Sequence, residues 1–149
     1  MVRDSDPVPA SEWQSIVEYV PLVSVDLVVE HDGGVLLGRR ENEPAKGEWF
    51  VPGGRVQKGE QLREAVFRVA ESELGADIEI REELGAFEHF YETSDVECPK
   101  HYVANGYHVW TDETVFDTDD QHEGLAVFEG LPTDLHEYVG DYLEAAGIR

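Results

Sequence analysis

The sequence predicts a single α+β domain, and three observations support this. The chain has 149 residues, of which 41% are hydrophobic, which is enough to form one core. Apolar and polar residues alternate over residues 22–30, as in a half-buried strand. Over residues 61–74 the apolar residues recur three and four apart, as in a helix. We expect one domain over residues 1–149, with a loose tail at residues 1–9.

The other elements follow from similar local patterns. Ser11 could cap a short helix over residues 12–19. The sequence His31-Asp32-Gly33-Gly34 is typical of a hairpin that joins the strand at 22–30 to a second strand at 35–38. Further strands are expected at 49–51, 78–84, 86–91, 102–110 and 125–128, followed by a closing helix at 132–146.

The charge pattern argues against general nucleic-acid binding. The formal net charge is −22, and the only lysines are Lys46, Lys58 and Lys100. A phosphate backbone needs a basic surface, which this composition does not offer. Cys98 is the only cysteine, so no internal disulfide forms. The N-terminal residues have no apolar signal-peptide core, and no apolar run is long enough to span a membrane, so we expect a cytoplasmic protein.

A solvated acidic surface without a specific partner is the simplest reading of this charge. An acidic, lysine-poor surface also suggests a protein from a high-salt cytoplasm, where salt screens self-repulsion. We therefore predict that dialysis to low salt unfolds the chain, because repulsion among its carboxylates is then unscreened. The measurement is a circular dichroism spectrum at high and low salt; an unchanged spectrum would contradict the hypothesis.

The most informative segment is residues 53–76, GGRVQKGEQLREAVFRVAESELGA. The preceding proline and the two glycines mark a turn in which backbone can approach a ligand closely. Glu60 lies at the start of the predicted helix, where the helix dipole favours a carboxylate, and Gly75 is the expected stop. Glu73 falls in line with the apolar face. On helix geometry alone, it either reaches water at a frayed end or binds a partner such as a metal.

The spacing of five residues in this segment resembles the Nudix box, G-x5-E-x7-R-E-U-x-E-E-x-G-U with U aliphatic. The matching residues are Gly54, Glu60, Arg68, Glu73 and Gly75. Many positions of this signature are fixed, so chance agreement is far less probable than for a lone glycine-rich loop. The resemblance implies a Nudix-type α/β/α sandwich, with a mixed central sheet and the box helix packed on it.

Two carboxylates of the box are missing, because Val69 and Ser72 stand at positions that are usually glutamate. In the common pattern these glutamates help to bind several divalent ions for attack on phosphorus. The stretch from Pro21 to Gly75, together with segments around residues 101–103 and 120–122, resembles GDP-mannose mannosyl hydrolases, a branch that also lacks them. This resemblance implies hydrolysis of GDP-mannose or GDP-glucose to GDP and free sugar, with water attacking the anomeric carbon.

The resemblance also implies the site residues. Mg²⁺, or Mn²⁺, would be bound by the Gly53 carbonyl, Glu73 and Gln121, and His122 would be the general base. Arg40, Arg55 and Tyr102 would contact the diphosphate, and Asp26 would orient the sugar. Helix spacing, rather than the resemblance, predicts a structural role for Arg68, which lies one turn after Glu64 and can pair with it. Several of these residues could also have a role that involves no ligand. Asp26 could be a loop-bonded strand residue, Tyr102 a half-buried strand residue and His122 an exposed loop residue. Arg39 and Arg40 could form ion pairs at the surface with Glu41 or Glu43.

Two other functions stay open. A conventional Nudix pyrophosphohydrolase would cleave a nucleoside diphosphate derivative at phosphorus. A non-catalytic domain would bind a nucleotide sugar without turnover. The resemblance suggests a homodimer. The loop between Tyr91 and His101 is shorter than in the mannosyl hydrolases, so the identity of the sugar and the base stays open.

Overall fold

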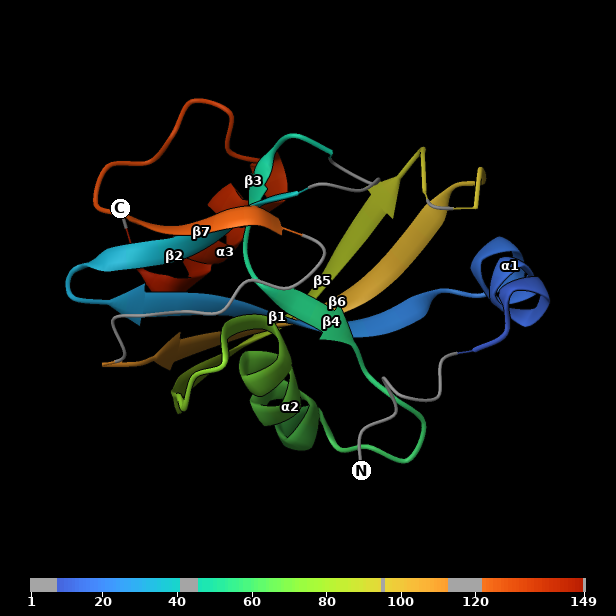
Figure 1. Ribbon diagram of the computed structural model, residues 1–149, viewed down its shortest axis with the longest axis horizontal. Helices are drawn as coiled ribbons and strands as arrows, with labels where there is room; N and C mark the ends of the chain where they lie inside the picture. The colour runs from blue at the N-terminus through green and yellow to red at the C-terminus, as the bar shows by residue number, and fades with distance from the viewer. Residues whose placement is uncertain (1–7, 41–45, 95, 113–121, 149) are drawn as a thin grey trace.

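The computed structural model describes residues 8–40, 46–94, 96–112 and 122–148 (Figure 1). Residues 1–7 of the predicted tail lie outside these ranges. The elements in chain order are α1 (Ala10–Tyr19), β1 (Leu22–His31), β2 (Gly34–Arg40), β3 (Trp49–Phe50), β4 (Gly53–Arg55), α2 (Leu62–Leu74), β5 (Glu79–Tyr91), β6 (Lys100–Trp110), β7 (His122–Phe128) and α3 (Glu137–Ala146).

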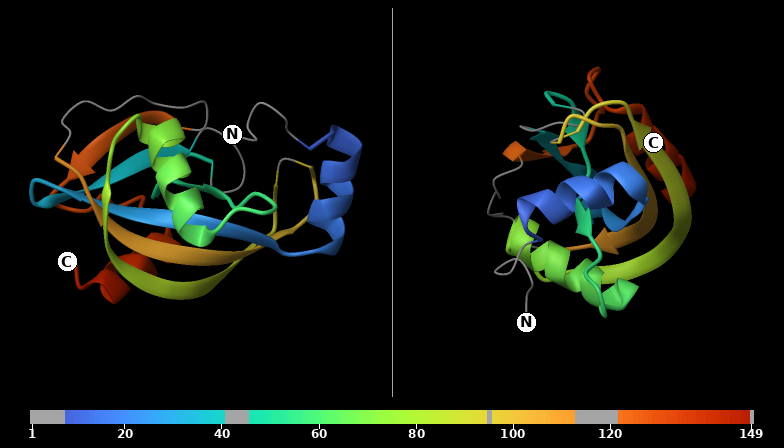
Figure 2. Two further views of the ribbon diagram at one scale, coloured as in Figure 1. Left: turned by 90° about the horizontal axis from the view of Figure 1, so that it is seen from below. Right: turned by 90° about the vertical axis from the view of Figure 1, so that its right-hand side faces the viewer.

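The strands form one mixed sheet, as predicted. Its main path runs β3-β2-β1-β6-β5, with β4 paired to β1 and β7 paired to β2. Strands β1 and β6 are parallel, and the other pairs are antiparallel. Helices α2 and α3 lie on opposite sides of the sheet, and α1 lies at one end (Figure 2). The predicted α+β sandwich is therefore confirmed.

The side chains of β1 point alternately to the two faces of the sheet and so contribute to two hydrophobic clusters. Val25, Leu27 and Val29 face α2 and pack with its apolar residues, because successive side chains in a strand point to opposite faces. Val28 faces the other side and packs with residues of α3. Asp26 is on the α3 side by the same alternation. The fold therefore directs this carboxylate into the interior rather than to a solvated edge.

The turns and the box helix agree with the sequence prediction. Asp32 and Gly33 both have positive φ, 49° and 83°, as a two-residue type I′ hairpin requires. Helix α2 begins with a capping box between Gln61 and Glu64 and ends at Gly75, whose φ of 63° is left-handed. Local chemistry specifies each of these features.

Three element predictions were wrong in detail. The N-cap of α1 is Pro9, whose carbonyl accepts from Trp13 N–H, and the Ser11 hydroxyl instead donates to Glu12. The closing helix begins only at Glu137, because His136 is an extended N-cap whose ring accepts from Tyr138 N–H. The two strands expected at 78–84 and 86–91 are one strand, β5. The pairing of β5 with β6 shifts register between residues 80 and 82 and again between residues 83 and 85, so the strand continues through both irregular positions.

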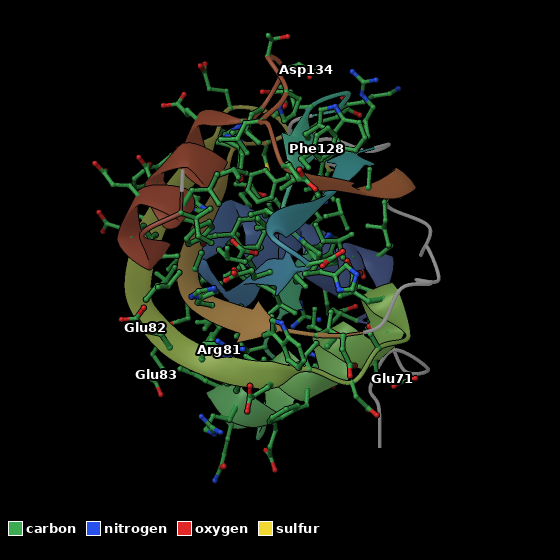
Figure 3. The ribbon with its side chains drawn as sticks, turned by 90° about the vertical axis from the view of Figure 1, so that its left-hand side faces the viewer. Glu71, Arg81, Glu82, Glu83, Phe128 and Asp134 are labelled. Carbon is green, nitrogen blue, oxygen red and sulfur yellow. The ribbon has the colours of Figure 1, made fainter. Side chains whose placement is uncertain are left out.

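The acidic residues spread over the outside of the molecule. Figure 3 shows Glu71 on α2, Glu82 and Glu83 on β5, and Asp134 before α3, at separate places on the surface. Glu71, Glu82 and Glu83 are exposed. This distribution is that of a generally solvated acidic surface.

Candidate active site

The site is centred on Asp26, a carboxylate in the middle of β1. Asp26 is only 7% exposed, and the centre of its strand is otherwise apolar. The hydroxyl of Tyr142 on α3 donates to Asp26 Oδ2 over 2.6 Å. A buried carboxylate is costly without such a donor. The hydrogen bond therefore joins α3 to the centre of the sheet.

Two glycines make room for this pair. Gly53 on β4 is directly opposite Asp26, and a Cβ there would overlap Asp26 Oδ1 and lie 2.8 Å from the Val25 carbonyl oxygen. Gly106 on β6 is the other neighbour of Asp26, and a Cβ there would lie 2.7 Å from Cε1 of Tyr142. Larger residues at either position would displace the pair.

Burial shifts the pKa of Asp26 from its ordinary value. It raises the pKa of Asp26 to about 6, while the hydrogen bond from Tyr142 and the charge of Arg40 oppose the rise. The ordinary value is 3.8, so the folded state keeps its proton to a higher pH than the unfolded chain. The stability contributed by the neutral carboxyl is therefore lost as the pH rises from about 4 to about 6. At neutral pH the ionised form predominates.

His89 on β5 lies beside Asp26 and is 2% exposed. Its Nδ1 is 3.9 Å from Asp26 Oδ2, and its ring stacks on Tyr138 with centroids 4.0 Å apart. Burial, with a smaller effect of His136, lowers the pKa of His89 to about 4, so the ring is neutral at pH 7. Within the described part of the chain, its buried Nε2 has no hydrogen-bond partner. Such an atom calls for a ligand or a water molecule.

Arginines border this centre. Burial raises the pKa values of Asp26 and Tyr91, and Arg40, the last residue of β2, is close enough for its charge to oppose both rises. Arg39 instead forms an ion pair with Asp134 and donates to the Gly47 carbonyl. Arg55 on β4 is opposite Ser24, and its guanidinium lies 5.3 Å from the centroid of Trp13. The sequence prediction preferred Arg40 to Arg39, and the structure turns Arg39 toward Asp134.

The Arg68 side chain supports the end of β4 at Arg55. It donates to Glu60 through Nε at 2.7 Å and to the Arg55 carbonyl oxygen at 2.8 Å. The expected pair with Glu64 is wrong, because the Glu64 carboxylate accepts from Gln61 N–H in the capping box. The structural role predicted for Arg68 is retained with a different partner.

Comparison with known proteins assigns the family. A model of the NUDIX domain matches residues 20–138. The chain belongs to the Nudix family. It is 57% identical over 140 residues to the low-salt glycan biosynthesis protein Agl8 of Haloferax volcanii, covering 93% of this chain and 90% of that protein. It is 40% identical over 67 residues to the ADP-ribose pyrophosphatase of Methanocaldococcus jannaschii, covering 45% and 40% of the two chains.

Solved structures agree with this assignment. A MutT NUDIX hydrolase from Burkholderia pseudomallei is 30% identical, with a TM-score of 0.69, and the match covers 84% of this chain and 97% of that one. A UDP-X diphosphatase has a TM-score of 0.64 at 18% identity, covering 99% and 75%, and so shares the fold. Nudix hydrolases act on small nucleotide derivatives and generally use a divalent metal such as Mg²⁺.

The Nudix box of this chain offers few metal ligands. Val69 is buried, and a Cβ on Gly54 would lie 3.0 Å from its Cγ2, so its position belongs to the core. Glu73 is half-buried one helical turn after Val69. Among the described residues, no group of three or more His, Cys, Asp or Glu could hold a metal ion. Glu73 and the Gly53 carbonyl are hard oxygen donors that fit Mg²⁺ if a diphosphate supplies further oxygens. Gln121 lies outside the described residues.

The remaining predicted residues have defined strand positions. Tyr102 on β6 is opposite Leu22 of β1 and His89 of β5. Its ring centroid is 6.1 Å from that of Tyr91. His122 begins β7, and its backbone is opposite Arg40. The fold thus brings the strand positions of His122 and Arg40 side by side.

Other residues of this region carry only weak signals in the sequence. Tyr142 falls on the apolar face of the predicted closing helix, which indicates packing rather than a partner for its hydroxyl. Its hydroxyl could have been paired with Asp26 only if the docking of α3 were known. His89 begins the ring-rich segment His89-Phe90-Tyr91, which contains no local signal of a contact with Asp26. Trp13 carries no sequence signal for the site, and the one signal for Lys100 is that it lies two residues from Tyr102 and so shares a strand face with it.

Across the described residues, no helix is both long and apolar enough to cross a membrane.

We predict that Tyr142→Phe costs more stability at pH 8 than at pH 5. Loss of the hydroxyl leaves the ionised Asp26 without its donor, a cost of about 1–3 kcal/mol, and raises the pKa of Asp26 further. At pH 5 the carboxyl is mostly protonated, so the cost is smaller. The measurement is the free energy of unfolding at both pH values in high salt.

Tyr138→Phe is the matched control. The Tyr138 hydroxyl contacts the backbone of Phe90, which carries no charge. Its loss should cost the same at both pH values. In an Asp26→Asn background, the cost of Tyr142→Phe should also become independent of pH. A pH-independent cost in the native background would contradict the interpretation.

Proposed function

We propose that this Nudix protein hydrolyses a nucleotide sugar, GDP-mannose or GDP-glucose, to GDP and free sugar by attack of water on the anomeric carbon. The observation that carries the proposal is the buried Asp26–His89 pair, with Arg40 nearby and Arg55 on the adjoining strand β4, in a protein whose Nudix box lacks two carboxylates. A carboxylate near the sugar and cations near the diphosphate suit cleavage between them.

Asp26 would act on the sugar. At neutral pH it is mostly ionised, and its second oxygen is not the one that accepts from Tyr142. It would accept a hydrogen bond from a sugar hydroxyl and stabilise the positive charge that develops on the anomeric carbon. His89 has a buried Nε2 without a partner among the described residues, and this atom would meet a second hydroxyl.

The diphosphate would be held by cations and a hydroxyl. Arg40 and Arg55 present guanidinium groups, which match phosphate with two parallel donors. Tyr102 would add a hydroxyl donor. These groups stabilise the charge that accumulates on the leaving diphosphate as the bond to carbon breaks. Mg²⁺, held by Glu73, the Gly53 carbonyl and Gln121, supplies further positive charge when bound.

His122 would take the proton from the attacking water. The pairing of β7 with β2 brings its backbone opposite Arg40, and this supports a position near the proposed diphosphate. An imidazole that titrates near neutrality suits a general base.

The relatives support this proposal in two ways. Agl8 is described as a glycan biosynthesis protein, which favours a sugar-containing substrate. It belongs to Haloferax volcanii, a halophile, which favours the proposed high-salt origin of the acidic surface. The ADP-ribose pyrophosphatase relative favours the alternative, cleavage at phosphorus, but it matches only 45% of the chain. The homodimer stays a prediction.

We predict that purified protein with GDP-mannose, Mg²⁺ and high salt releases GDP and mannose, separated by HPLC. His122→Ala should lower the rate at least about 100-fold, because a general base contributes roughly 10²- to 10⁴-fold. His108→Gln is the control, because its ring contacts Glu30 away from the proposed site, and it should keep activity. GMP and mannose 1-phosphate as products would instead establish phosphorus chemistry.

A further inference from the structure

His136 is a half-buried histidine that the mechanism above does not use. It is the N-cap of α3, and its Nδ1 accepts from the N–H of Tyr138 over 3.1 Å. A neutral imidazole that accepts at Nδ1 carries its hydrogen on Nε2. Among the described residues, this Nε2 has no hydrogen-bond acceptor. The capping bond therefore orients a single donor that this part of the protein leaves unused.

The backbone of His136 is anchored on strand β3. Its N–H donates to the carbonyl oxygen of Trp49 over 3.1 Å, and the neighbouring Leu135 forms a parallel bridge with Trp49. Trp49 is in turn opposite Arg39 of β2, the strand that ends at Arg40. His136 is therefore held by the sheet, on the side of the site where β2 carries Arg40.

A series of ring contacts joins His136 to the carboxylate of Asp26. The ring centroid of His136 is 4.8 Å from that of Tyr138 and 5.8 Å from that of Tyr91. Tyr138 stacks on His89, whose Nδ1 is 3.9 Å from Asp26 Oδ2. His136 thus belongs to the same aromatic cluster as the buried Asp26–His89 pair.

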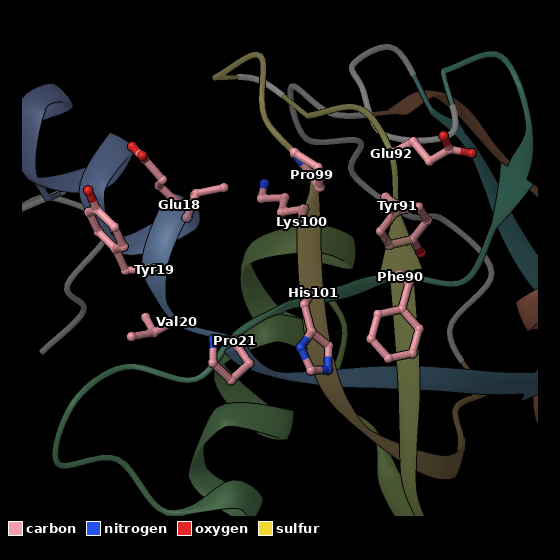
Figure 4. Close-up of a pocket in the computed structure, with 11 residues that line it drawn as sticks. Glu18, Tyr19, Val20, Pro21, Phe90, Tyr91, Glu92, Pro99, Lys100 and His101 are labelled. Carbon is pink, nitrogen blue, oxygen red and sulfur yellow. The ribbon is translucent and has the colours of Figure 1, made fainter.

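This cluster lies on the Asp26 face of the sheet. His89 and Tyr91 are two residues apart on β5 and so share a face, the one on which His89 approaches Asp26. Phe90 lies between them and points to the opposite face. There it stacks on His101 with ring centroids 4.5 Å apart, and Figure 4 shows the two rings side by side. The rings around His136 therefore belong to the face of the proposed reaction.

The chemistry of this cluster fits an uncharged ligand group. Burial is the main cause that lowers the pKa of His136, although Glu48 and Glu137 oppose it, and burial also lowers the pKa of His89. Both rings are therefore neutral at pH 7. A neutral imidazole offers one donor and no charge, which suits a hydroxyl better than a phosphate. Aromatic walls with a few polar groups are typical of small-molecule sites.

We propose that His136 is a sugar-binding residue whose Nε2–H donates to a hydroxyl of the substrate's hexose, beside the Asp26–His89 pair. This inference rests on the proposed function for the identity of the ligand. It makes His136 a specificity determinant that favours a nucleotide sugar over the free nucleoside diphosphate. Helix α3 then contributes to the site twice, through Tyr142 and through its N-cap.

The test compares the binding of GDP-mannose and of GDP by calorimetry, in high salt with Mg²⁺. All chains carry His122→Ala to slow turnover, and HPLC checks that the GDP-mannose stays intact. His136→Asn retains a capping acceptor near the position of Nδ1 but removes the Nε2 donor. It should weaken GDP-mannose binding roughly three- to tenfold, because one neutral hydrogen bond is lost, and change GDP binding less than about twofold.

Two further variants separate binding from helix capping. His136→Gln places an amide donor near the position of Nε2 and loses the cap. It should therefore bind GDP-mannose more tightly than His136→Asn does, although it unfolds at a lower temperature. His108→Asn is the matched control, because its ring contacts Glu30 away from the proposed site, and it should bind both ligands like the parent chain.

The outcomes separate this inference from the proposed function. Unchanged GDP-mannose binding in His136→Asn would contradict the inference, and so would an equal loss of GDP and GDP-mannose binding, which would show that His136 only shapes the site. If binding changes as expected but the native protein releases GMP and mannose 1-phosphate, the proposed function fails and His136 still binds the sugar. If the native chain binds neither GDP-mannose nor GDP-glucose, both proposals are wrong.

Discussion

The hydrogen bond between Tyr142 and the buried carboxylate of Asp26 is the constraint on which the site depends. It crosses from α3 to the centre of the sheet and joins residues 116 positions apart. It requires glycine on both neighbouring strands, at Gly53 and Gly106, because a Cβ at either would strike the pair. The box turn and the parallel partner strand therefore both leave room for the carboxyl group of Asp26 and its partner, and the closing helix supplies that partner.

Charge is ordered along this face of the sheet. The ionised carboxylate of Asp26 and the neutral ring of His89 lie at one end, and Arg55 and Lys100 lie toward α1. The chain has 11 lysines and arginines against 33 aspartates and glutamates, so two cations at the ring of Trp13 are unusual for this composition. A ligand with a polar, uncharged end and an anionic middle would complement this order. A nucleotide sugar has that form.

The sequence predicted features that depend on neighbouring residues and missed those that depend on packing. The hairpin at Asp32-Gly33 and the helix stop at Gly75 follow from backbone preferences within a few residues. Asp26 is conspicuous in the sequence, because a carboxylate in the middle of an apolar strand is costly. Its partner could not be named, since Tyr142 fits the apolar face of its helix equally well. The partner of Arg68 was wrong for a related reason: helix spacing suggested Glu64, whereas the fold of the preceding loop presents Glu60.

The central claim is that water attacks the sugar carbon, so the fate of the water oxygen tests it most directly. The reaction with GDP-mannose would be run in ¹⁸O-labelled water with Mg²⁺ and high salt, and the products would be analysed at once by mass spectrometry. The account predicts the label in mannose and none in GDP. Label in a phosphate group would contradict it and would mean that the protein attacks phosphorus despite its reduced box.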